Sequence, residues 1–183
     1  MSSFLEAGEF PVEVVNIASS KEKGPGRPPF WEMVFWWTRK PLASARAVIL
    51  ASLLPADFNP NTFLRTVYPS YQGGGRFGKT PHFLNPNLGN LSRELREKIG
   101  KVRLLDPFAG FGSIPLEAVR LGVGEVVAAE LLPTAYIFLK AVLEYPKWAS
   151  SEKLGERLVK DVERWGMWIT ERLREDPDLR ELY

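Results

Sequence analysis

Residues 102–131 constrain the fold of this chain more than any other stretch of its sequence. They read in order as a short apolar strand, a loop with two glycines, a helix, and a second apolar strand over residues 125–129. Glu130 follows directly at the carboxyl end of the second strand. This order predicts an α/β unit that makes up half of a nucleotide-type binding site.

The loop before the helix suits the close approach of a ligand. Gly110 and Gly112 are one residue apart, so the backbone can turn sharply and lie against a small molecule without interference from Cβ atoms. Ser113 is a good N-cap, and Pro115 suits the first helical turn. The predicted apolar face of the helix consists of Ile114, Leu116, Val119 and Leu121.

The second strand and its flanking residues narrow the class of ligand. Residues 126–128 suit a sheet buried on both faces, and Glu130 emerges where ribose hydroxyls are usually held. A dinucleotide site needs a third glycine where this chain has Pro115, so NAD and FAD are disfavoured. Asp106 at the start of the loop would face a positively charged group. S-adenosylmethionine carries both an amino group and a sulfonium, so the spacing favours it.

Two motifs carry a resemblance to a known family. Residues 106–113, Asp-Pro-Phe-Ala-Gly-Phe-Gly-Ser, resemble motif I of the amino-methyltransferases that modify DNA bases, Asp-Pro-Phe-x-Gly-x-Gly. Residues 36–47 contain Trp-Trp-Thr-Arg-Lys-Pro-Leu-Ala. This stretch is similar to the Trp-Trp-x-Arg-Arg/Lys-Pro-Leu-Ala signature of large adenine-specific DNA methyltransferases that begin with a domain of unknown function (DUF1156). The resemblance covers most of this chain but only the first part of those proteins.

The resemblance implies an α/β, partial Rossmann-like fold of the S-adenosylmethionine-dependent methyltransferases, with adenine N6 of DNA as the target and DNA as a partner. The implied cofactor-binding residues are Asp106, Pro107, Phe108, Ala109, Gly110, Gly112, Ser113, Glu130 and Leu131. Residues 108–112 would pass beneath the methionine and adenosine parts of the cofactor. Asp106 would face the amino or sulfonium end, and Glu130 would accept hydrogen bonds from the ribose hydroxyls. An RNA methyltransferase is the alternative, because motif I is shared among such enzymes.

An aromatic and basic segment lies upstream, over residues 30–40. The resemblance implies that part of it forms the cofactor pocket or contacts nucleic acid, since aromatic rings stack on bases and cations meet phosphates. The residues concerned are Trp36, Trp37, Arg39 and Lys40. Packing in the core is the other interpretation of the aromatic side chains, which include Trp31 and Phe35. The family usually has a histidine where this chain has Arg27, so the preceding loop departs from the pattern.

Residues 73–80, Gly-Gly-Gly-Arg-Phe-Gly-Lys-Thr, fit the P-loop pattern Gly-x-x-x-x-Gly-Lys-Ser/Thr. A P-loop runs from a buried strand into a helix, whereas Pro81 follows this segment directly. We therefore interpret it as a flexible glycine loop that carries Arg76 and Lys79 near DNA or cofactor. A nucleotide-binding, P-loop-like protein is the alternative. His82 is predicted to be a loop residue with no catalytic task.

The chain lacks the catalytic loop Asp/Asn-Pro-Pro-aromatic that the amino-methyltransferases carry. Its nearest counterpart is residues 27–30, Arg-Pro-Pro-Phe, but arginine offers only donors and cannot accept a hydrogen bond from the target amine. Only two or three strands are apparent where seven are usual. These gaps predict a split enzyme in which a second protein chain supplies the catalytic loop. The alternatives are a nucleic-acid-binding remnant without catalysis, or a homo-oligomer that covers the unpaired strand edge.

The amino-acid composition argues against several other classes of protein. The chain has 183 residues, 45% of them hydrophobic, and a formal net charge of +2, so it predicts a globular domain without an overall basic character. With no cysteine and one histidine, disulfides, thiolate chemistry and a metal site are not expected. No apolar run has the length of a membrane span, so we predict a cytoplasmic protein. The abundance of Glu, Lys and Arg also fits a thermophile.

We predict four segments: an arm and Pro/Gly linker (1–29), an aromatic and helical segment with a long Gly/Pro/Asn loop (30–100), the motif I unit (101–149) and an amphipathic helix (150–183). We expect a strand or packed arm over residues 12–17, little regular structure over residues 56–90, and a helix over residues 91–100. We also expect a helix over residues 42–54, whose apolar face consists of Leu42, Ala45, Val48, Ile49 and Leu53. Last come a helix over 131–144 ended by Tyr145-Pro146, and a long helix capped by Ser150 or Ser151 and ended by Asp176-Pro177.

Overall fold

The computed structural model describes residues 2–24, 27–29 and 36–180. The predicted packing of Trp31 and Phe35 therefore lies outside the described residues. The chain divides into two compact units, Met1–Leu139 and Lys140–Tyr183, and each is described by itself.

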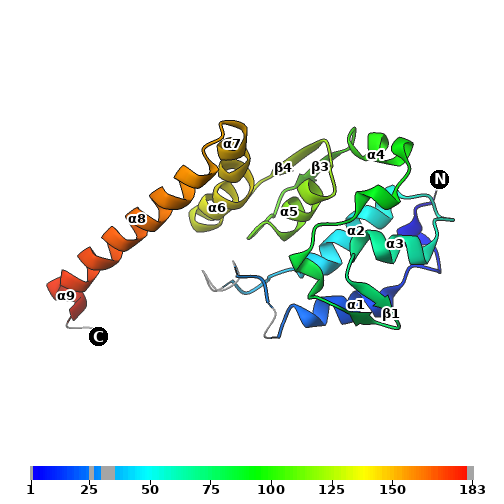
Figure 1. Cartoon of the computed structure of the whole chain (residues 1–183), viewed down its shortest axis with the longest axis horizontal. Helices are drawn as coiled ribbons and strands as arrows, with labels where there is room; N and C mark the ends of the chain where they lie inside the picture. The colour runs from blue at the N-terminus through cyan, green and yellow to red at the C-terminus, as the bar shows by residue number, and fades with distance from the viewer. Residues whose placement is uncertain (1, 25–26, 30–35, 181–183) are drawn as a thin grey trace. The chain divides into compact units, whose positions relative to one another are not determined.

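The first unit combines helices with two small sheets of two strands each (Figure 1). Its elements are η1 (Phe4–Glu6), α1 (Val12–Lys21), α2 (Leu42–Leu53), α3 (Pro60–Val67), β1 (Tyr71–Gly73), β2 (Arg76–Phe77), η3 (Pro81–Phe83), η4 (Leu88–Asn90), α4 (Arg93–Ile99), β3 (Arg103–Asp106), α5 (Ser113–Arg120), β4 (Glu125–Ala128) and α6 (Pro133–Leu139). The chain therefore mixes α and β elements, in line with the coarse fold class expected from the sequence.

Of the strand or packed arm predicted over residues 12–17, the strand is wrong, because this stretch belongs to helix α1, whereas the packing against the rest of the unit is present. Val15 and Ala18, three positions apart on one helical face, are buried in the core of the unit, and α1 lies along α2. Val12 and Ile17 remain exposed. The helix forms because its contacts with α2 outweigh the weak strand preference of the Val and Ile residues.

Helix α2 is the centre of the core and contacts α1, α3 and α5 (Figure 1). The prediction of a single apolar face is wrong for Val48, which is 43% exposed. Almost every other side of the helix is buried, because its small residues let neighbouring helices approach closely. The buried residues of α2 are Leu42, Ala43, Ala45, Arg46, Ala47, Ile49, Leu50 and Ala51.

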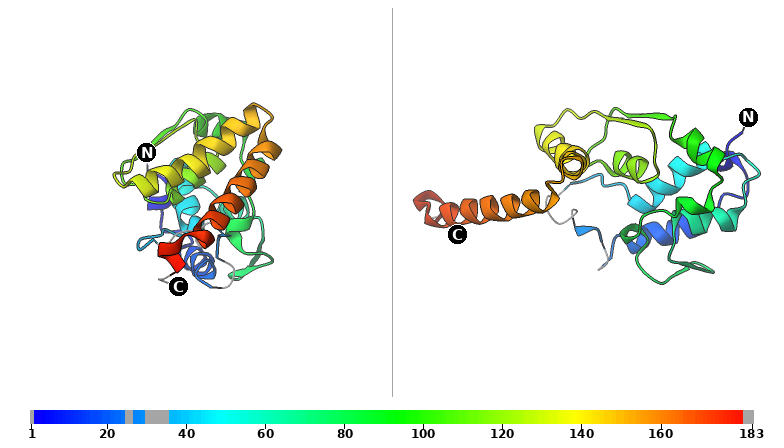
Figure 2. Two further views of the ribbon diagram at one scale, coloured as in Figure 1. Left: turned by 90° about the vertical axis from the view of Figure 1, so that its left-hand side faces the viewer. Right: turned by 45° about the horizontal axis from the view of Figure 1, so that its top comes forward.

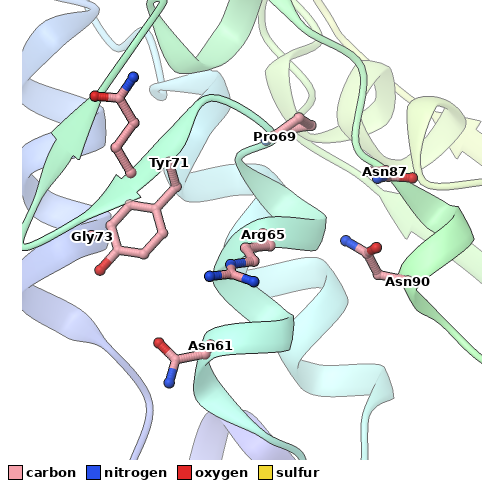
Figure 3. A pocket seen from close by; sticks show the side chains of 8 residues that line it. Asn61, Arg65, Pro69, Tyr71, Gly73, Asn87 and Asn90 are labelled. Atoms are coloured by element: carbon pink, nitrogen blue, oxygen red, sulfur yellow. The ribbon is translucent and has the colours of Figure 1, made fainter.

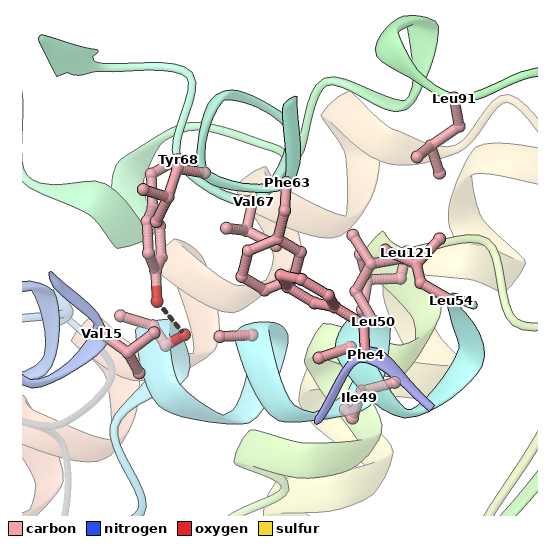
Figure 4. Packing of buried hydrophobic residues seen from close by; sticks show 14 of the residues in the cluster. Phe4, Val15, Ile49, Leu50, Leu54, Phe63, Val67, Tyr68, Leu91 and Leu121 are labelled. Atoms are coloured by element: carbon pink, nitrogen blue, oxygen red, sulfur yellow. Dashed lines mark hydrogen bonds between the residues drawn. The ribbon is translucent and has the colours of Figure 1, made fainter. Parts of the chain in front are cut away.

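Aromatic side chains fill the space beside α2 (Figure 4). Phe4 and Phe63 are fully buried, with ring centroids 5.0 Å apart. The hydroxyl of the buried Tyr68 donates a hydrogen bond of 2.7 Å to the carbonyl of Ala43, which provides the phenol with a partner inside the core.

The prediction of little regular structure over residues 56–90 is also wrong, since α3 and the antiparallel hairpin β1–β2 lie within it. Asn59-Pro60 acts as a helix start. The Asn59 side chain accepts a 2.9 Å hydrogen bond from the Thr62 N–H, and Pro60 occupies the first helical position. A segment rich in Pro and Asn thus begins a helix whose apolar side is buried. The helix predicted over residues 91–100 is confirmed as α4, and the Ser92 side chain caps it by accepting a 3.2 Å hydrogen bond from the Leu95 N–H.

Strands β3 and β4 are parallel, with Asp106 opposite Ala128 at their carboxyl ends, and α5 connects them. The expectation that β4 is buried on both faces is wrong. Leu104 and Val126 pack against the core, whereas Leu105 and Val127, which alternate with them, are 66% and 44% exposed. Within the described residues, this sheet is covered on one face only.

The second unit consists of the π-helix η5 (Lys140–Glu144), α7 (Tyr145–Ser151), α8 (Gly155–Glu175) and α9 (Pro177–Arg180). Tyr145-Pro146 does not end a helix, because a proline is accommodated in the first turn of α7. The predicted caps Ser150 and Ser151 lie inside α7, while the stop at Asp176 is confirmed. Two further views show α8 as one continuous helix (Figure 2). None of the described helices is long and apolar enough to cross a membrane.

Candidate functional site

The glycine loop lies across the carboxyl ends of β3 and β4. The strand ladder continues beyond the strands, because Ala129 N–H donates to the Asp106 carbonyl at 2.9 Å and Ala109 N–H donates to the Ala129 carbonyl at 3.0 Å. Gly110 and Gly112 have φ angles of +53° and +78°, a conformation that favours glycine. The predicted sharp turn at the two glycines is therefore present, but Gly112 is buried and Gly110 is half-buried, so the loop backbone is not openly exposed.

The predicted N-cap is shifted by one residue. Ser113 is the first residue of α5 and is buried, and Gly112 is the residue that precedes the helix. The left-handed backbone of Gly112 turns the chain from the loop into α5, so no serine side chain is needed there.

Trp36 packs directly against the loop. A Cβ atom on Gly110 would lie 3.1 Å from the indole Nε1 of Trp36, and the centroid of the Trp36 ring lies 4.6 Å from that of Phe111. Phe111 in turn stacks on Phe138 of α6, at 4.2 Å. The aromatic segment predicted to join this site does so through Trp36, whereas Trp37 is 81% exposed.

Glu130 holds the loop in place. One carboxylate oxygen accepts a 2.8 Å hydrogen bond from the N–H of Gly110, and the other accepts hydrogen bonds from Leu131 (2.8 Å) and Leu132 (3.2 Å). These hydrogen bonds lower the pKa of Glu130 below its ordinary value. The bond from Leu132 has the largest effect, followed by the bond from Gly110. A carboxylate has about four lone-pair sites, so roughly one remains for a donor outside the chain.

A cavity of about 320 Å³ opens beside the loop. It brings two cations from the upstream segment, Arg39 and Lys40, together with the carboxyl group of Asp106 and the ring of Phe108, which is 88% exposed. Asp106 also accepts a hydrogen bond from the Phe108 N–H at 3.2 Å. The remaining lining residues are Thr38, Ala109, Gly110, Phe111, Ser113 and Ile114. Of the predicted site residues, Pro107, Gly112, Glu130, Leu131, Trp36 and Trp37 are not among those that line the cavity.

Arg76 and Lys79 do not line this cavity either. Their segment forms the β1–β2 hairpin, in which Gly73 pairs with Arg76, and it continues into the three-residue 3₁₀ helix η3. A P-loop needs a helix whose first amides surround a phosphate, and the three-residue η3 does not provide one.

A buried ion network below the glycine loop was not anticipated from the sequence. The guanidinium of Arg46 in α2 donates to both oxygens of Glu117 in α5, at 2.5 and 3.2 Å, and both side chains are fully buried. Arg46 also donates to the carbonyls of Val67 and Leu84, both at 2.9 Å. Arg120 donates to Glu117 at 2.5 Å, to Leu84 and His82 carbonyls, and to Asn85.

This network fixes the helix that follows the loop. It joins α2 to α5 and also anchors residues 82–85, a stretch with little regular structure of its own. The one sequence signal was a charged residue within each of two largely apolar helices, Arg46 in α2 and Glu117 in α5.

Glu22 provides the cap that α2 lacks locally. Pro41 precedes α2 and has no capping side chain, and the two carboxylate oxygens of Glu22 accept hydrogen bonds from the N–H groups of Leu42 (2.8 Å) and Ala43 (2.5 Å). Glu22 is fully buried, and this burial raises its pKa to about 7. The segment predicted as an arm and Pro/Gly linker, residues 1–29, therefore contributes a core residue.

His82 is buried in η3, with 4% of its surface exposed. Neither ring nitrogen has a hydrogen-bond partner among the described residues. Burial, and then the charges of Arg120 and Arg46, lower the pKa of His82 to about 4. The ring is therefore neutral near neutral pH.

Comparison with known proteins gives one family match. Residues 9–70, about a third of the chain, match the family described as Protein of unknown function (DUF1156). The match agrees with the DUF1156 part of the resemblance drawn from the sequence. It covers α1, α2 and α3 and ends before the glycine loop. No curated protein and no solved structure matches the chain.

Proposed function

We propose that the cavity beside the glycine loop binds S-adenosylmethionine, and that the chain is the cofactor-binding part of a DNA amino-methyltransferase acting on adenine N6. The observation that supports this proposal best is the loop itself. It crosses the adjacent ends of two parallel strands, leads into a helix, and is held by an acidic residue at the end of the second strand. We propose that these elements belong to a partial Rossmann-like fold.

The side chains of the cavity suit the charges of this cofactor. Arg39 and Lys40 are cations that can meet its carboxylate, and Asp106 is an anion for its amino or sulfonium group. The exposed ring of Phe108 offers an apolar surface to the adenine. The remaining acceptor position of Glu130 can take a ribose hydroxyl. When bound, the cofactor supplies a methyl group on a sulfonium.

The remaining parts of the enzyme would come from elsewhere. The sequence has no Asp/Asn-Pro-Pro-aromatic loop, and the exposed Leu105 and Val127 give the two-stranded sheet an uncovered apolar face. We propose that a second protein chain adds strands and helices to this sheet and supplies the catalytic loop. Burial of these side chains would then favour assembly.

Isothermal titration calorimetry with S-adenosylmethionine and S-adenosylhomocysteine tests the cofactor proposal. We expect binding that Asp106→Asn weakens about tenfold, because a charged contact in a partly enclosed site becomes neutral. Glu94→Gln, an exposed carboxylate of α4, is the matched control and should bind as the unmodified chain does. Equal affinities for all three proteins would contradict the proposed role of Asp106. Absence of binding at millimolar ligand by a chain that is folded by circular dichroism would count against the site in the isolated chain.

A further inference from the structure

A second cavity, of about 430 Å³, lies between α3, the β1–β2 hairpin and η4 (Figure 3). It shares no lining residue with the cavity beside the glycine loop. In the view of Figure 3, Arg65 lies between the ring of Tyr71 and the side chain of Asn90. We call this cavity the hairpin groove. Its polar lining side chains are Asn61, Arg65, Tyr71, Gln72, Asn87 and Asn90.

The groove has a distinctive chemistry. Four of its side chains are carboxamides, each of which offers both donors and an acceptor, and one is a phenol. The single charged lining residue is Arg65, and no lining residue is acidic. No described carboxylate pairs with Arg65, which is exposed on α3. The groove therefore suits a ligand with negative charge, hydrogen-bonding edges of both kinds and a flat ring.

The hairpin carries a second exposed cation, Arg76, which is not itself a lining residue of the groove. Arg76 is the cross-strand partner of Gly73, which lines the groove, and no described carboxylate pairs with Arg76. Consecutive phosphates of one nucleic-acid strand require cations at more than one position, which a free mononucleotide does not. Two arginines on different elements fit an extended strand better.

Hydrogen bonds and a ring contact within the protein hold some of the residues that line the groove. The Asn87 N–H donates to the carbonyl of Thr66 at 2.8 Å, which ties the segment before η4 to α3. The Asn87 side-chain oxygen accepts a hydrogen bond from the Gly89 N–H at 3.2 Å. The side-chain N–H₂ group of Asn87 is not used in this bond and can donate to a ligand. The ring of Tyr71 packs on Phe77 across the hairpin at 5.7 Å. Two of the lining side chains, Asn87 and Tyr71, are thus held in place before a ligand binds.

We propose that the hairpin groove binds a single strand of DNA. Arg65 and Arg76 contact phosphates, Tyr71 stacks on a base, and the carboxamides of Asn61 and Asn90 meet base edges. A base can stack on Tyr71 and offer its Watson–Crick edge to these carboxamides only when it is unpaired, so the groove fits a separated strand rather than an intact duplex. The choice of DNA rests on the proposed methyltransferase function, whereas the groove itself is independent of the cofactor cavity.

Fluorescence anisotropy with a short labelled single-stranded DNA, over a series of salt concentrations, tests the proposal on the full chain. Arg65→Gln should weaken binding about tenfold and reduce the slope of log K against log salt by about 0.7, the value for one phosphate contact on a single strand. Arg96→Gln, an exposed arginine of α4 outside the groove, is the matched control and should leave both quantities nearly unchanged. Equal effects of the two variants would overturn the assignment, because they would indicate diffuse charge attraction.

A second pair of variants tests the base contacts without removing charge. Tyr71→Leu should weaken binding about tenfold through lost stacking, and Asn61→Ala, at an exposed position of α3, should weaken it by a smaller factor without affecting folding. Unchanged affinity in both would overturn the proposal, as would tighter binding of single-stranded RNA or of AMP alone. Titration of each variant with S-adenosylmethionine distinguishes the two sites. Loss of DNA binding with cofactor binding retained locates the defect in the groove, and the reverse result contradicts only the cofactor site.

Discussion

The two glycine-rich segments of this protein, residues 73–80 and 106–113, use glycine in the same way but build different structures. Both place glycines in the left-handed region, with φ of +55° at Gly74 and +53° at Gly110. The first segment turns between two antiparallel strands, and the second crosses the ends of two parallel strands and enters α5. The glycines permit a turn in either case. The flanking elements decide whether the turn closes an antiparallel hairpin or connects a strand to a helix.

The two segments also differ in what holds them. The 106–113 loop contacts Trp36 and Glu130, and the helix after it is anchored by the buried network of Arg46 and Glu117. The 73–80 turn is held by hairpin bonds and by the Ser70 hydroxyl, which donates to the Lys79 carbonyl at 2.9 Å. We therefore expect matched substitutions to have larger effects around the 106–113 loop.

The largest expected difference concerns two arginines. Arg46→Met leaves the fully buried Glu117 with less compensation of its charge and should reduce the free energy of unfolding by about 3–5 kcal/mol. Arg76→Met, at the exposed hairpin, should change it by less than about 0.5 kcal/mol. Urea denaturation measures both. Replacing both partners, Arg46→Met with Glu117→Met, should recover part of the lost stability. If the loss in this double variant equals the sum of the losses in Arg46→Met alone and Glu117→Met alone, the two side chains do not pair directly.

Alanine at two glycines with nearly the same φ separates backbone strain from contact. Gly74→Ala should lower the free energy of unfolding by about 1–2 kcal/mol through strain alone, since a Cβ there meets nothing within 4 Å. Gly110→Ala carries the same strain and also presses on Trp36 at 3.1 Å, which adds about 1 kcal/mol. Urea denaturation of both variants gives the difference. If Gly110→Ala is no more costly than Gly74→Ala, Trp36 does not restrain the loop.

Glu130→Gln tests how firmly the 106–113 loop is held. The amide has one acceptor oxygen and no charge, so the bonds from Gly110, Leu131 and Leu132 weaken and stability should fall by about 1 kcal/mol. Because the folded pKa of Glu130 is lowered, its contribution is present above the ordinary carboxyl pKa and is lost as pH falls through the folded pKa. The melting temperatures of the variant and of the unmodified chain should therefore become equal at acidic pH. A constant difference at all pH values would argue against the carboxylate.

The smallest expected effect is on the pH dependence of the whole chain, because two buried groups oppose each other. His82 has a folded pKa of about 4, below its usual value, so between about pH 4 and 6.5 the unfolded state binds more protons and stability rises with pH. Glu22 has a folded pKa of about 7, so from about pH 4.5 to 7 the folded state binds more protons and stability falls as pH rises.

Single variants reveal the two contributions. His82→Leu should give a chain whose stability decreases from pH 4.5 to 6.5, and Glu22→Gln a chain whose stability increases over the same range. Urea midpoints at several pH values measure this. Parallel curves for the two variants would show that neither group titrates as its burial implies.

Much of the arrangement of the candidate site could be predicted, because its residues are close together in the sequence. Gly110, Gly112 and Glu130 lie within one strand–loop–helix–strand stretch, so their proximity at the sheet edge was predictable from the order of elements. The contact of Trp36 with Gly110 was suggested only by the family resemblance. The partners of Arg46 and of Glu22 were not predicted, because Glu117 lies 71 positions beyond Arg46, and Leu42 lies 20 positions beyond Glu22.

The sequence by itself determined the glycine turns, the helix predicted over residues 91–100, and the parallel unit around the loop, because these depend on backbone preferences of neighbouring residues. Only the tertiary structure decided that residues 12–21 form a helix, that α2 is buried on almost every side, and that Glu22 caps it. These outcomes depend on which surfaces meet. Burial of apolar area and the pairing of buried charges act between residues far apart in the chain, and no local pattern encodes them.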